Sequence, residues 1–386
     1  MSPLPRHVKP RILEALHDTR IVVLQGARQA GKTTLVSEIA ADVSGRLVTL
    51  DDDLTRAAAE ADPSGFLTQV PGGILAIDEV QRVPALVLAL KVAVDRDPRP
   101  GRFLLTGCAN LLRLPAMQDS LAGESLLGHT SSLTRQDYLE RACAGSYPEA
   151  LARTPGRRRA AWLDNYVQRI VERDAADVSR LQQLEELPRL LRMLAARNAG
   201  ELNIMALAND VGMPARTLAP YLGPLETLFL VQRIPAWSTN VSKRVVSRPK
   251  ATLLDTGLAA RLVNVSAAGA SVTANPDLAG RLLEGFVAGE IRRQLGWSEQ
   301  TARLSHYPDH AGAEVDLVLE TDDGRIAGVE VKATSSVTGR DATWLTQLRD
   351  RLGSRFTGGV VLHTGPTSAP FGDRIAALPM DVLWST

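Results

Sequence analysis

The sequence lacks the features of a disulfide-rich, zinc-binding or membrane-spanning protein. It has only two cysteines among 386 residues, too few for a disulfide framework or a zinc site. No apolar run approaches the roughly 20 residues of a transmembrane helix, and residues 1–7 lack a signal-peptide core. Hydrophobic residues make up 45% of the chain, which argues against disorder. We therefore expect a cytoplasmic protein without membrane contact, built from two or three domains that each bury a core.

The net charge of +1 is unevenly distributed along the chain. Residues 1–150 carry 16 basic and 18 acidic side chains, and residues 251–386 carry 12 and 16. Residues 151–250 carry 16 basic and 9 acidic side chains, a net charge of +7. This middle third is the candidate surface for a polyanion such as DNA or RNA. The alternative is that Arg157–Arg159 and its neighbours form a solvated face or a contact between domains.

A complete phosphate-binding P-loop occupies residues 26–34. It follows the apolar run 21–24 and precedes the helix-like run 35–40, which is the strand–loop–helix context that the motif requires. Its glycines allow successive N–H groups to point into one concavity, and the positive end of the following helix adds to that field. We expect the loop to bind ATP through Gly26, Ala27, Arg28, Gln29, Ala30, Gly31, Lys32, Thr33 and Thr34. Within it, the Lys32 side chain should reach the β- and γ-phosphates and the Thr33 hydroxyl should bind Mg²⁺.

An acidic pair, Asp78 and Glu79, follows the apolar run 73–77, a buried-strand pattern. At the end of a neighbouring parallel strand, such a pair supplies a second Mg²⁺ contact and a water-activating base. We assign Asp78 to the metal and Glu79 to catalysis; an N-terminal helix cap on a surface turn is the alternative. A third strand, 102–107, places Thr106 or the nearby Asn110 as a sensor of the γ-phosphate.

The middle of the chain predicts helices and a small wing. Residues 161–194 show helical periodicity. Residues 204–213 and 214–228 predict two helices separated by a glycine turn, and the run 229–234 predicts a strand. This order is typical of a winged-helix domain.

The second of these helices has an unusual composition. Pro220 and Pro224 are expected to interrupt it, because proline inside a helix costs about 3 kcal/mol. Arg216 is its only basic residue. These two features favour a structural or partner-docking role over the recognition of bases.

The last third predicts a hairpin with charged side chains on one face. Residues 313–320 and 326–332 alternate as strands around a turn at 322–325. Glu330 and Lys332 are two residues apart and project from the same face, where Asp316 on the partner strand can meet them. Two carboxylates and a lysine form the arrangement of metal-dependent phosphodiesterases. Asp316 and Glu330 would hold Mg²⁺, Lys332 would position the water or stabilise developing charge, and Glu284 upstream could add an outer carboxylate.

The flanking elements complete an αβββαβ order, with a helix at 341–352 and a strand at 359–363. The alternative for the charged residues is a cross-strand ion pair on an ordinary sheet edge.

Over nearly its full length the chain resembles the prokaryotic AAA-type P-loop ATPases that carry a C-terminal restriction-endonuclease-like domain of uncharacterised function. The resemblance implies a P-loop ATPase domain with a parallel sheet at 1–145, a helical winged-helix domain at 146–265, and a small α/β restriction-endonuclease-like domain at 275–386. The stretches that carry it are 26–34, 77–84, 103–107, 119–123, 147–150, 282–287, 314–316 and 328–333.

Two positions depart from the family pattern. The family usually has arginine after Ser-Leu-Ala-Gly, where this chain has Glu124, and commonly has serine where this chain has Cys108. If the arginine contacts nucleotide, another must replace it or turnover is slow, because an arginine finger contributes about 10³–10⁵-fold. The candidates for its replacement are Arg113, Arg135 and Arg173.

Two hypotheses for function follow. In the first, Mg²⁺-ATP binding changes the pose of a nuclease-like domain that cleaves or binds DNA or RNA. In the second, nucleotide state gates the binding of a protein partner, and the C-terminal site is inactive. The sequence leaves the oligomeric state open.

Overall fold

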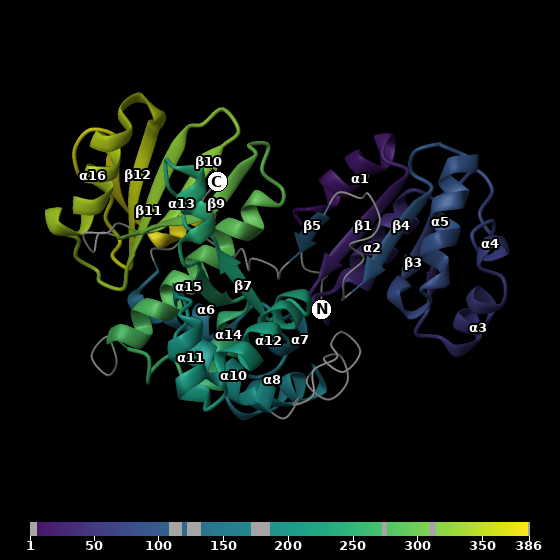
Figure 1. The fold of residues 1–386 in the computed structure, drawn as a ribbon, viewed down its shortest axis with the longest axis horizontal. Coiled ribbons are helices and arrows are strands. Elements are labelled where there is room, and N and C mark those ends of the chain that lie inside the picture. Colours follow the sequence, from purple (N-terminus) through teal and green to yellow (C-terminus); the bar gives the residue numbers. More distant parts are fainter. Residues whose placement is uncertain are drawn as a thin grey trace. The chain divides into compact units, whose positions relative to one another are not determined.

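The computed structural model describes residues 6–107, 118–121, 133–170, 186–271, 276–308 and 314–384 (Figure 1). The chain divides into two compact units. The first comprises Met1–Glu124 with Thr227–Phe229, and the second comprises Ser125–Glu226 with Leu230–Thr386. The finer division of the chain into domains at 1–145, 146–265 and 275–386 stays a prediction.

The first unit is built on a five-stranded parallel sheet in the order β2-β3-β4-β1-β5. The α/β class and the parallel sheet predicted for the N-terminal part are therefore confirmed. The strands are β1 (Ile21–Gly26), β2 (Arg46–Thr49), β3 (Leu75–Asp78), β4 (Phe103–Gly107) and β5 (Gln118–Leu121). The helices are α1 (Lys9–Asp18), α2 (Lys32–Asp42), α3 (Asp53–Ala61), α4 (Pro63–Phe66) and α5 (Ala85–Arg96).

Helices cover both faces of the central part of this sheet, which explains why β1, β3 and β4 are mainly apolar. Because side chains alternate along a strand, Ile21 and Val23 of β1 enter one core, with Leu86 and Leu90 of α5. Val22 and Leu24 enter the other core, which also contains buried side chains from the two helices α1 and α2. The sheet is thereby fixed between helical layers, and the carboxyl ends of its strands meet at one edge.

The second unit begins with helices and a small antiparallel sheet in the order β6-β8-β7. The helices are α6 (Arg135–Ala144), α7 (Pro148–Leu151), α8 (Arg157–Arg169), α10 (Leu187–Ala196), α11 (Ile204–Val211), α12 (Ala215–Thr227), α13 (Val241–Val246) and α14 (Thr256–Leu262). The strands are β6 (Gly200–Glu201), β7 (Val231–Ile234) and β8 (Lys250–Leu253). The predicted helix at 161–194 corresponds to α8 and α10, and its central residues lie outside the described ranges.

The predicted helix–turn–helix is present, but the prolines do not interrupt its second helix. α11 ends at Gly212 in a left-handed conformation, and α12 then continues through Pro220 and Pro224. The prediction of an interruption was wrong because a buried face compensates for the hydrogen bonds that proline removes. That face consists of Leu218, Tyr221, Leu222 and Leu225.

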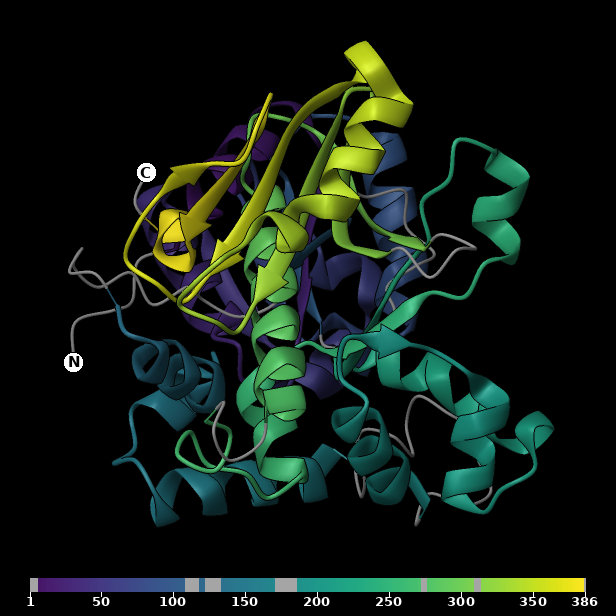
Figure 2. The same cartoon turned by 90° about the vertical axis from the view of Figure 1, so that its left-hand side faces the viewer.

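A six-stranded sheet in the order β13-β14-β12-β11-β10-β9 completes the second unit. The predicted hairpin is confirmed, since β10 (Glu314–Thr321) and β11 (Ile326–Lys332) pair antiparallel. β9 (Ala302–Pro308) adds to one side of it, and β12 (Phe356–His363), β14 (Ile375–Pro379) and β13 (Ala369–Pro370) add to the other. Two helices pack on this sheet: α15 (Pro276–Leu295) against β11, and α16 (Thr343–Leu352) against β11 and β12 (Figure 2). The sequence analysis missed β13 and β14.

Candidate functional site

The P-loop joins β1 to α2 through a backbone that few residue types adopt easily. Gly31 has φ 86° and Gln29 has φ 61°, both in the left-handed region. α2 begins at Lys32, immediately after this turn. The buried Lys32 Nζ donates to the carbonyl oxygens of Gly26 at 3.0 Å and Ala27 at 2.8 Å. The carbonyls of Gly26 and Ala27 thus meet the Lys32 ammonium group at the N-terminus of α2.

Asp78 lies at the carboxyl edge of the same sheet and accepts hydrogen bonds from several hydroxyl groups. The Thr33 hydroxyl donates to Asp78 Oδ2 at 3.0 Å, and the Thr49 hydroxyl donates to the same oxygen at 3.4 Å. The Thr106 hydroxyl donates to Asp78 Oδ1. Thr33 and Asp78, which are predicted to bind the Mg²⁺ ion at the P-loop, therefore meet directly, although they are 45 positions apart in the sequence.

The strand that carries Asp78 is not the immediate neighbour of the P-loop strand. β4 lies between β1 and β3, so the prediction of a neighbouring strand was wrong in this detail. The side chains still meet, because α2 starts above the edge where all these parallel strands end. Thr106 at the end of β4 bridges the gap, since its hydroxyl also accepts from the Glu79 backbone N–H at 3.2 Å. Thr106 therefore holds the Asp78 side chain and the Glu79 backbone in place.

Glu79 occupies a sharp turn directly after β3. Its backbone has φ 57° and ψ 44°, a left-handed conformation that is costly for a residue with a side chain. The Gln81 side-chain amide donates to Glu79 Oε2, which fixes the direction of the carboxylate. Such strain, held in place by its surroundings, is often found at functional sites.

Arg6 is a P-loop contact that the sequence analysis missed. Its Nη1 donates to the Ala30 carbonyl at 3.1 Å. Its Nη2 lies against Gly31, so a Cβ at that position would collide with the guanidinium. Arg6 precedes α1 and is separated from the loop by a full helix and strand, and no local pattern points to it.

Five residues that the sequence analysis discussed lie outside the described ranges: Cys108, Asn110, Arg113, Glu124 and Arg173. Arg135, another candidate to replace the arginine of the family, stands at the start of α6 in the second unit. Its Nε donates to the Thr364 hydroxyl at 3.5 Å.

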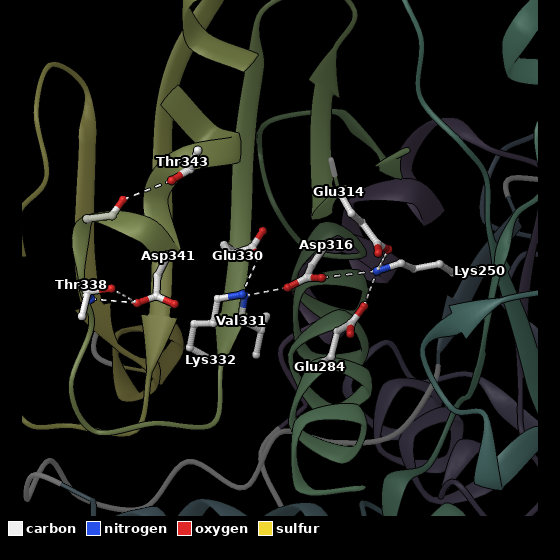
Figure 3. Close-up of polar contacts among 11 residues, drawn as sticks. Lys250, Glu284, Glu314, Asp316, Glu330, Val331, Lys332, Thr338, Asp341 and Thr343 are labelled. Atoms are coloured by element: carbon white, nitrogen blue, oxygen red, sulfur yellow. Dashed lines mark hydrogen bonds and ion pairs between the residues drawn. The ribbon is translucent and has the colours of Figure 1, made fainter. Parts of the chain in front are cut away.

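Two of the three C-terminal residues predicted to hold a metal, Glu284 and Asp316, face a buried lysine together with Glu314 (Figure 3). Lys250 Nζ lies 2.5 Å from Glu284 Oε1, 2.5 Å from Glu314 Oε1 and 3.4 Å from Asp316 Oδ1. Only 3% of the Lys250 side chain is exposed. We call these four residues the lysine cluster. It unites three elements, because Lys250 begins β8, Glu284 lies on α15, and Glu314 and Asp316 lie on β10.

The second pair of predicted residues forms its own contact beside the lysine cluster. Lys332 Nζ donates to Glu330 Oε1 at 2.7 Å, as expected for two side chains on one face of a strand. Asp316 Oδ2 accepts from the Val331 backbone N–H at 2.8 Å, so the Asp316 carboxylate continues the β10–β11 pairing beyond Leu317. A bulge between Val315 and Val318 in the pairing of β10 with β9 redirects this part of the strand.

The charge balance of the lysine cluster shifts the pKa of its members. Burial lowers the pKa of Lys250, but the carboxylates of Glu284, Asp316 and Glu314 outweigh burial and hold it above its ordinary value. Burial, together with the negative charge of Asp316, raises the pKa of Glu284 to about 8. Burial and Asp316 likewise raise the pKa of Glu330 to about 8, against the effect of Lys332. One ammonium group does not neutralise three carboxylates.

These contacts do not fit a metal ion held by Glu284, Asp316 and Glu330. One Asp316 oxygen faces the Lys250 ammonium and the other accepts from a backbone N–H. One Glu330 oxygen accepts from Lys332, and Glu284 faces Lys250. In the parts of the chain that the structure describes, no group of three or more His, Cys, Asp or Glu side chains is placed to hold a metal ion.

Family models match three segments of the chain. Residues 18–139 match an AAA domain, residues 135–269 match "Domain of unknown function (DUF8612)", and residues 279–383 match "Domain of unknown function (DUF4143)". The parallel sheet, the P-loop and the AAA match define a P-loop protein of the AAA type, which supports ATP binding. Among the described residues, no helix has both the length and the apolar character needed to cross a membrane.

The chain also has full-length relatives. It is 31% identical to the uncharacterized protein Rv2008c of Mycobacterium tuberculosis and to the uncharacterized protein Mb2031c of Mycobacterium bovis. Each alignment covers 99% of this chain and 85% of the relative. This protein therefore belongs to the same family as Rv2008c and Mb2031c.

Similarity to solved structures is distant. The Walker-type ATPase PABY2304 of Pyrococcus abyssi is 14% identical, with 67% of this chain and 96% of that chain covered and a TM-score of 0.39. A single-residue variant of RuvB from Thermotoga maritima is 20% identical, with 59% and 89% covered and a TM-score of 0.24.

Proposed function

We propose that this protein is a Mg²⁺-dependent ATPase. The observation that carries the proposal is the 3.0 Å hydrogen bond between Thr33 Oγ1 and Asp78 Oδ2 at the N-terminus of α2. A hydroxyl and a carboxylate oxygen from these two elements are ligands that Mg²⁺ accepts, with phosphate oxygens and waters completing its shell. These residues fit the ion, which when bound to ATP neutralises charge on the phosphates.

The protein side chains have distinct tasks in this proposal. The Lys32 ammonium exchanges its contacts with the Gly26 and Ala27 carbonyls for the β- and γ-phosphates. The Glu79 carboxylate, held by Gln81, orients a water molecule toward the γ-phosphate and receives its proton. Thr106 supports the catalytic edge by holding both Asp78 and the Glu79 backbone.

The test is ATP turnover and ATP binding in three variants. Glu79→Gln should bind ATP almost as tightly as the unmodified protein but turn over at least about 100-fold more slowly. Lys32→Ala should lose ATP binding. Lys91→Ala, at an exposed position on α5, is the matched control and should change neither. Unchanged turnover in Glu79→Gln would refute the proposed base.

We infer further that residues 275–386 form the restriction-endonuclease-like domain that the sequence predicts. The α15, β9-β10-β11, α16, β12 order and the Glu330–Lys332 pair support this assignment. Similar folds serve for cleavage and for binding alike, so the activity depends on the site. Since its contacts do not fit a metal, we derive no cleavage step. The site favours the second hypothesis, a nucleotide-gated switch or scaffold for a protein partner, with an inactive nuclease-like domain.

The middle segment supports the same interpretation. α11, the Gly212 turn, α12 and the β6-β8-β7 sheet support the winged-helix assignment. Arg216 is exposed and is the only basic residue of α12, which favours a docking role over base recognition.

Two measurements separate the hypotheses. Mg²⁺-dependent cleavage of labelled DNA or RNA that disappears in Asp316→Ala would establish a nuclease. Binding to nucleic acid without cleavage should weaken about 10³-fold between 50 and 200 mM salt if about six phosphates are contacted. The switch hypothesis expects no cleavage and no such salt-dependent binding.

A further inference from the structure

Lys250 is a cation buried inside a ring of acidic groups. Lysine is rarely buried, and a buried ammonium group persists only when anionic partners compensate for the lost water. Here three carboxylates from two other elements supply that compensation, with two oxygens at 2.5 Å and one at 3.4 Å. The reverse also holds, because Glu284 and Asp316 are themselves largely buried and need a positive charge near them.

The ammonium nitrogen lies where a cation shared by Glu284, Glu314 and Asp316 would have to lie. Oxygen-bound divalent cations such as Mg²⁺ and Ca²⁺ lie roughly 2.0–2.6 Å from their carboxylate ligands. Lys250 Nζ lies at a comparable distance from Glu284 and Glu314, and Asp316 completes the set (Figure 3). Because this cation is a side chain of β8, it cannot dissociate from the cluster as a bound metal ion can.

We propose that the Lys250 ammonium is the resident cation of the lysine cluster. It takes the place of a divalent metal ion, and the cluster binds such an ion only when Lys250 is removed. The cluster is therefore a structural joint that ties β8 to α15 and β10. This proposal goes beyond ATP hydrolysis and does not depend on it.

The experiment measures divalent-cation binding and thermal stability in the full chain without nucleotide. All proteins carry Asp78→Asn, so that the P-loop contributes no cation site. In that background, the variants are Lys250→Met, which keeps side-chain bulk without charge, and Lys243→Met, which removes an exposed lysine of α13. The probe is Mn²⁺, with free Mn²⁺ counted by electron paramagnetic resonance.

The background protein and Lys243→Met should bind no Mn²⁺ at the cluster, and Mn²⁺ should not raise their Tm. Lys250→Met should have a lower Tm, bind Mn²⁺ at one site per chain, and recover part of the lost Tm when Mn²⁺ is added. Adding Glu284→Gln to Lys250→Met removes one repelling carboxylate. That double variant should melt higher than Lys250→Met and bind Mn²⁺ more weakly.

Three outcomes overturn the proposal. One is Mn²⁺ binding by the background protein that Asp316→Asn abolishes, because the cluster would then hold a metal alongside Lys250. Another is a Lys250→Met variant whose Tm does not respond to Mn²⁺. If Lys250→Met does not fold, the double variant decides: failure to restore folding would show that uncompensated carboxylates are not the cause. None of these outcomes bears on ATP turnover, so the ATPase proposal is judged separately.

Discussion

The side-chain amide of Asn198 lies directly against the backbone of Gly285 in α15. Asn198 is fully buried, its Nδ2 donates to the Arg281 carbonyl at 3.1 Å, and its Oδ1 accepts from the Leu253 backbone N–H at 2.9 Å. One amide therefore links α15 to β8. A Cβ at Gly285 would collide with this amide.

Two glycines of the same helix should therefore respond in opposite ways to alanine. Gly280→Ala, where a Cβ would meet nothing within 4 Å, should raise the free energy of unfolding by about 0.5–1 kcal/mol. Gly285→Ala should lower it by about 1–3 kcal/mol, because the added methyl group displaces Asn198. Urea denaturation of the two variants measures both values. Equal changes in the free energy of unfolding for the two variants would contradict the contact between Asn198 and Gly285.

Thr106 should affect turnover more than ATP affinity. Thr106→Val removes the hydroxyl that holds Asp78 and the Glu79 backbone N–H, which leaves buried polar groups unpaired at a cost of about 1–3 kcal/mol. We expect kcat to fall about tenfold or more, with a small change in KM. Thr106→Ser keeps the hydroxyl and should keep most of the turnover. A large loss in Thr106→Ser together with unchanged turnover in Thr106→Val would indicate that the methyl group, not the hydroxyl, matters.

Arg6 should contribute to ATP binding through the shape of the P-loop. Arg6→Ala removes the 3.1 Å bond to Ala30, and the loss of one hydrogen bond of about 0.5–1.5 kcal/mol weakens affinity by up to about tenfold. Titration with a fluorescent ATP analogue measures the change, and Arg20→Ala, at an exposed position, is the control. Gly31→Ala should abolish binding. Combining it with Arg6→Ala should restore little, because the φ of 86° remains unfavourable for alanine.

His306 should make the second unit less stable in acid. Burial lowers the pKa of this ring to about 4, with a further contribution from Lys250, and the Arg248 carbonyl accepts from Nε2 at 3.0 Å. The pKa of His306 in the folded protein is below the unfolded value of 6.5, so its neutral ring contributes fully to the free energy of unfolding above pH 6.5. This contribution is lost as the pH falls toward 4. The total loss is about 3 kcal/mol, since one pKa unit corresponds to about 1.4 kcal/mol.

The comparison variant is His306→Gln, which keeps an N–H donor for the Arg248 carbonyl and does not titrate. The difference in unfolding free energy between the unmodified protein and this variant should shrink steadily from pH 7 to pH 4. If the difference in unfolding free energy does not change with pH, His306 is not held as a buried neutral ring.

Features that depend on neighbouring residues were predictable from the sequence. The P-loop, the strand ending in Asp78 and the β10–β11 hairpin are each encoded within short windows by glycines, apolar runs and alternation. The same holds for the contact between Glu330 and Lys332, since residues two apart on a strand share a face.

Features that depend on distant segments were not predictable. The position of β4 between β1 and β3 follows from chain topology, and the contact of Arg6 with the P-loop joins residues 24 positions apart. Lys250 was counted only as one charge of a basic middle third, because no local pattern indicates that it enters an acidic site 34 to 66 positions away. The continuity of α12 through two prolines depends likewise on packing.

The lysine cluster limits how this protein can be divided into pieces. A chain cut between residues 271 and 276 would separate Lys250 from Glu284, Glu314 and Asp316. It would also separate Trp237 from the His306 carbonyl, to which its backbone N–H donates at 2.6 Å. The upstream fragment would present a solvent-facing ammonium on β8, and the downstream fragment would keep three carboxylates with no counter-charge from β8. We therefore expect both fragments to be less stable than the same segments in the intact chain, and residues 250 and 276–384 to act as parts of one folding unit.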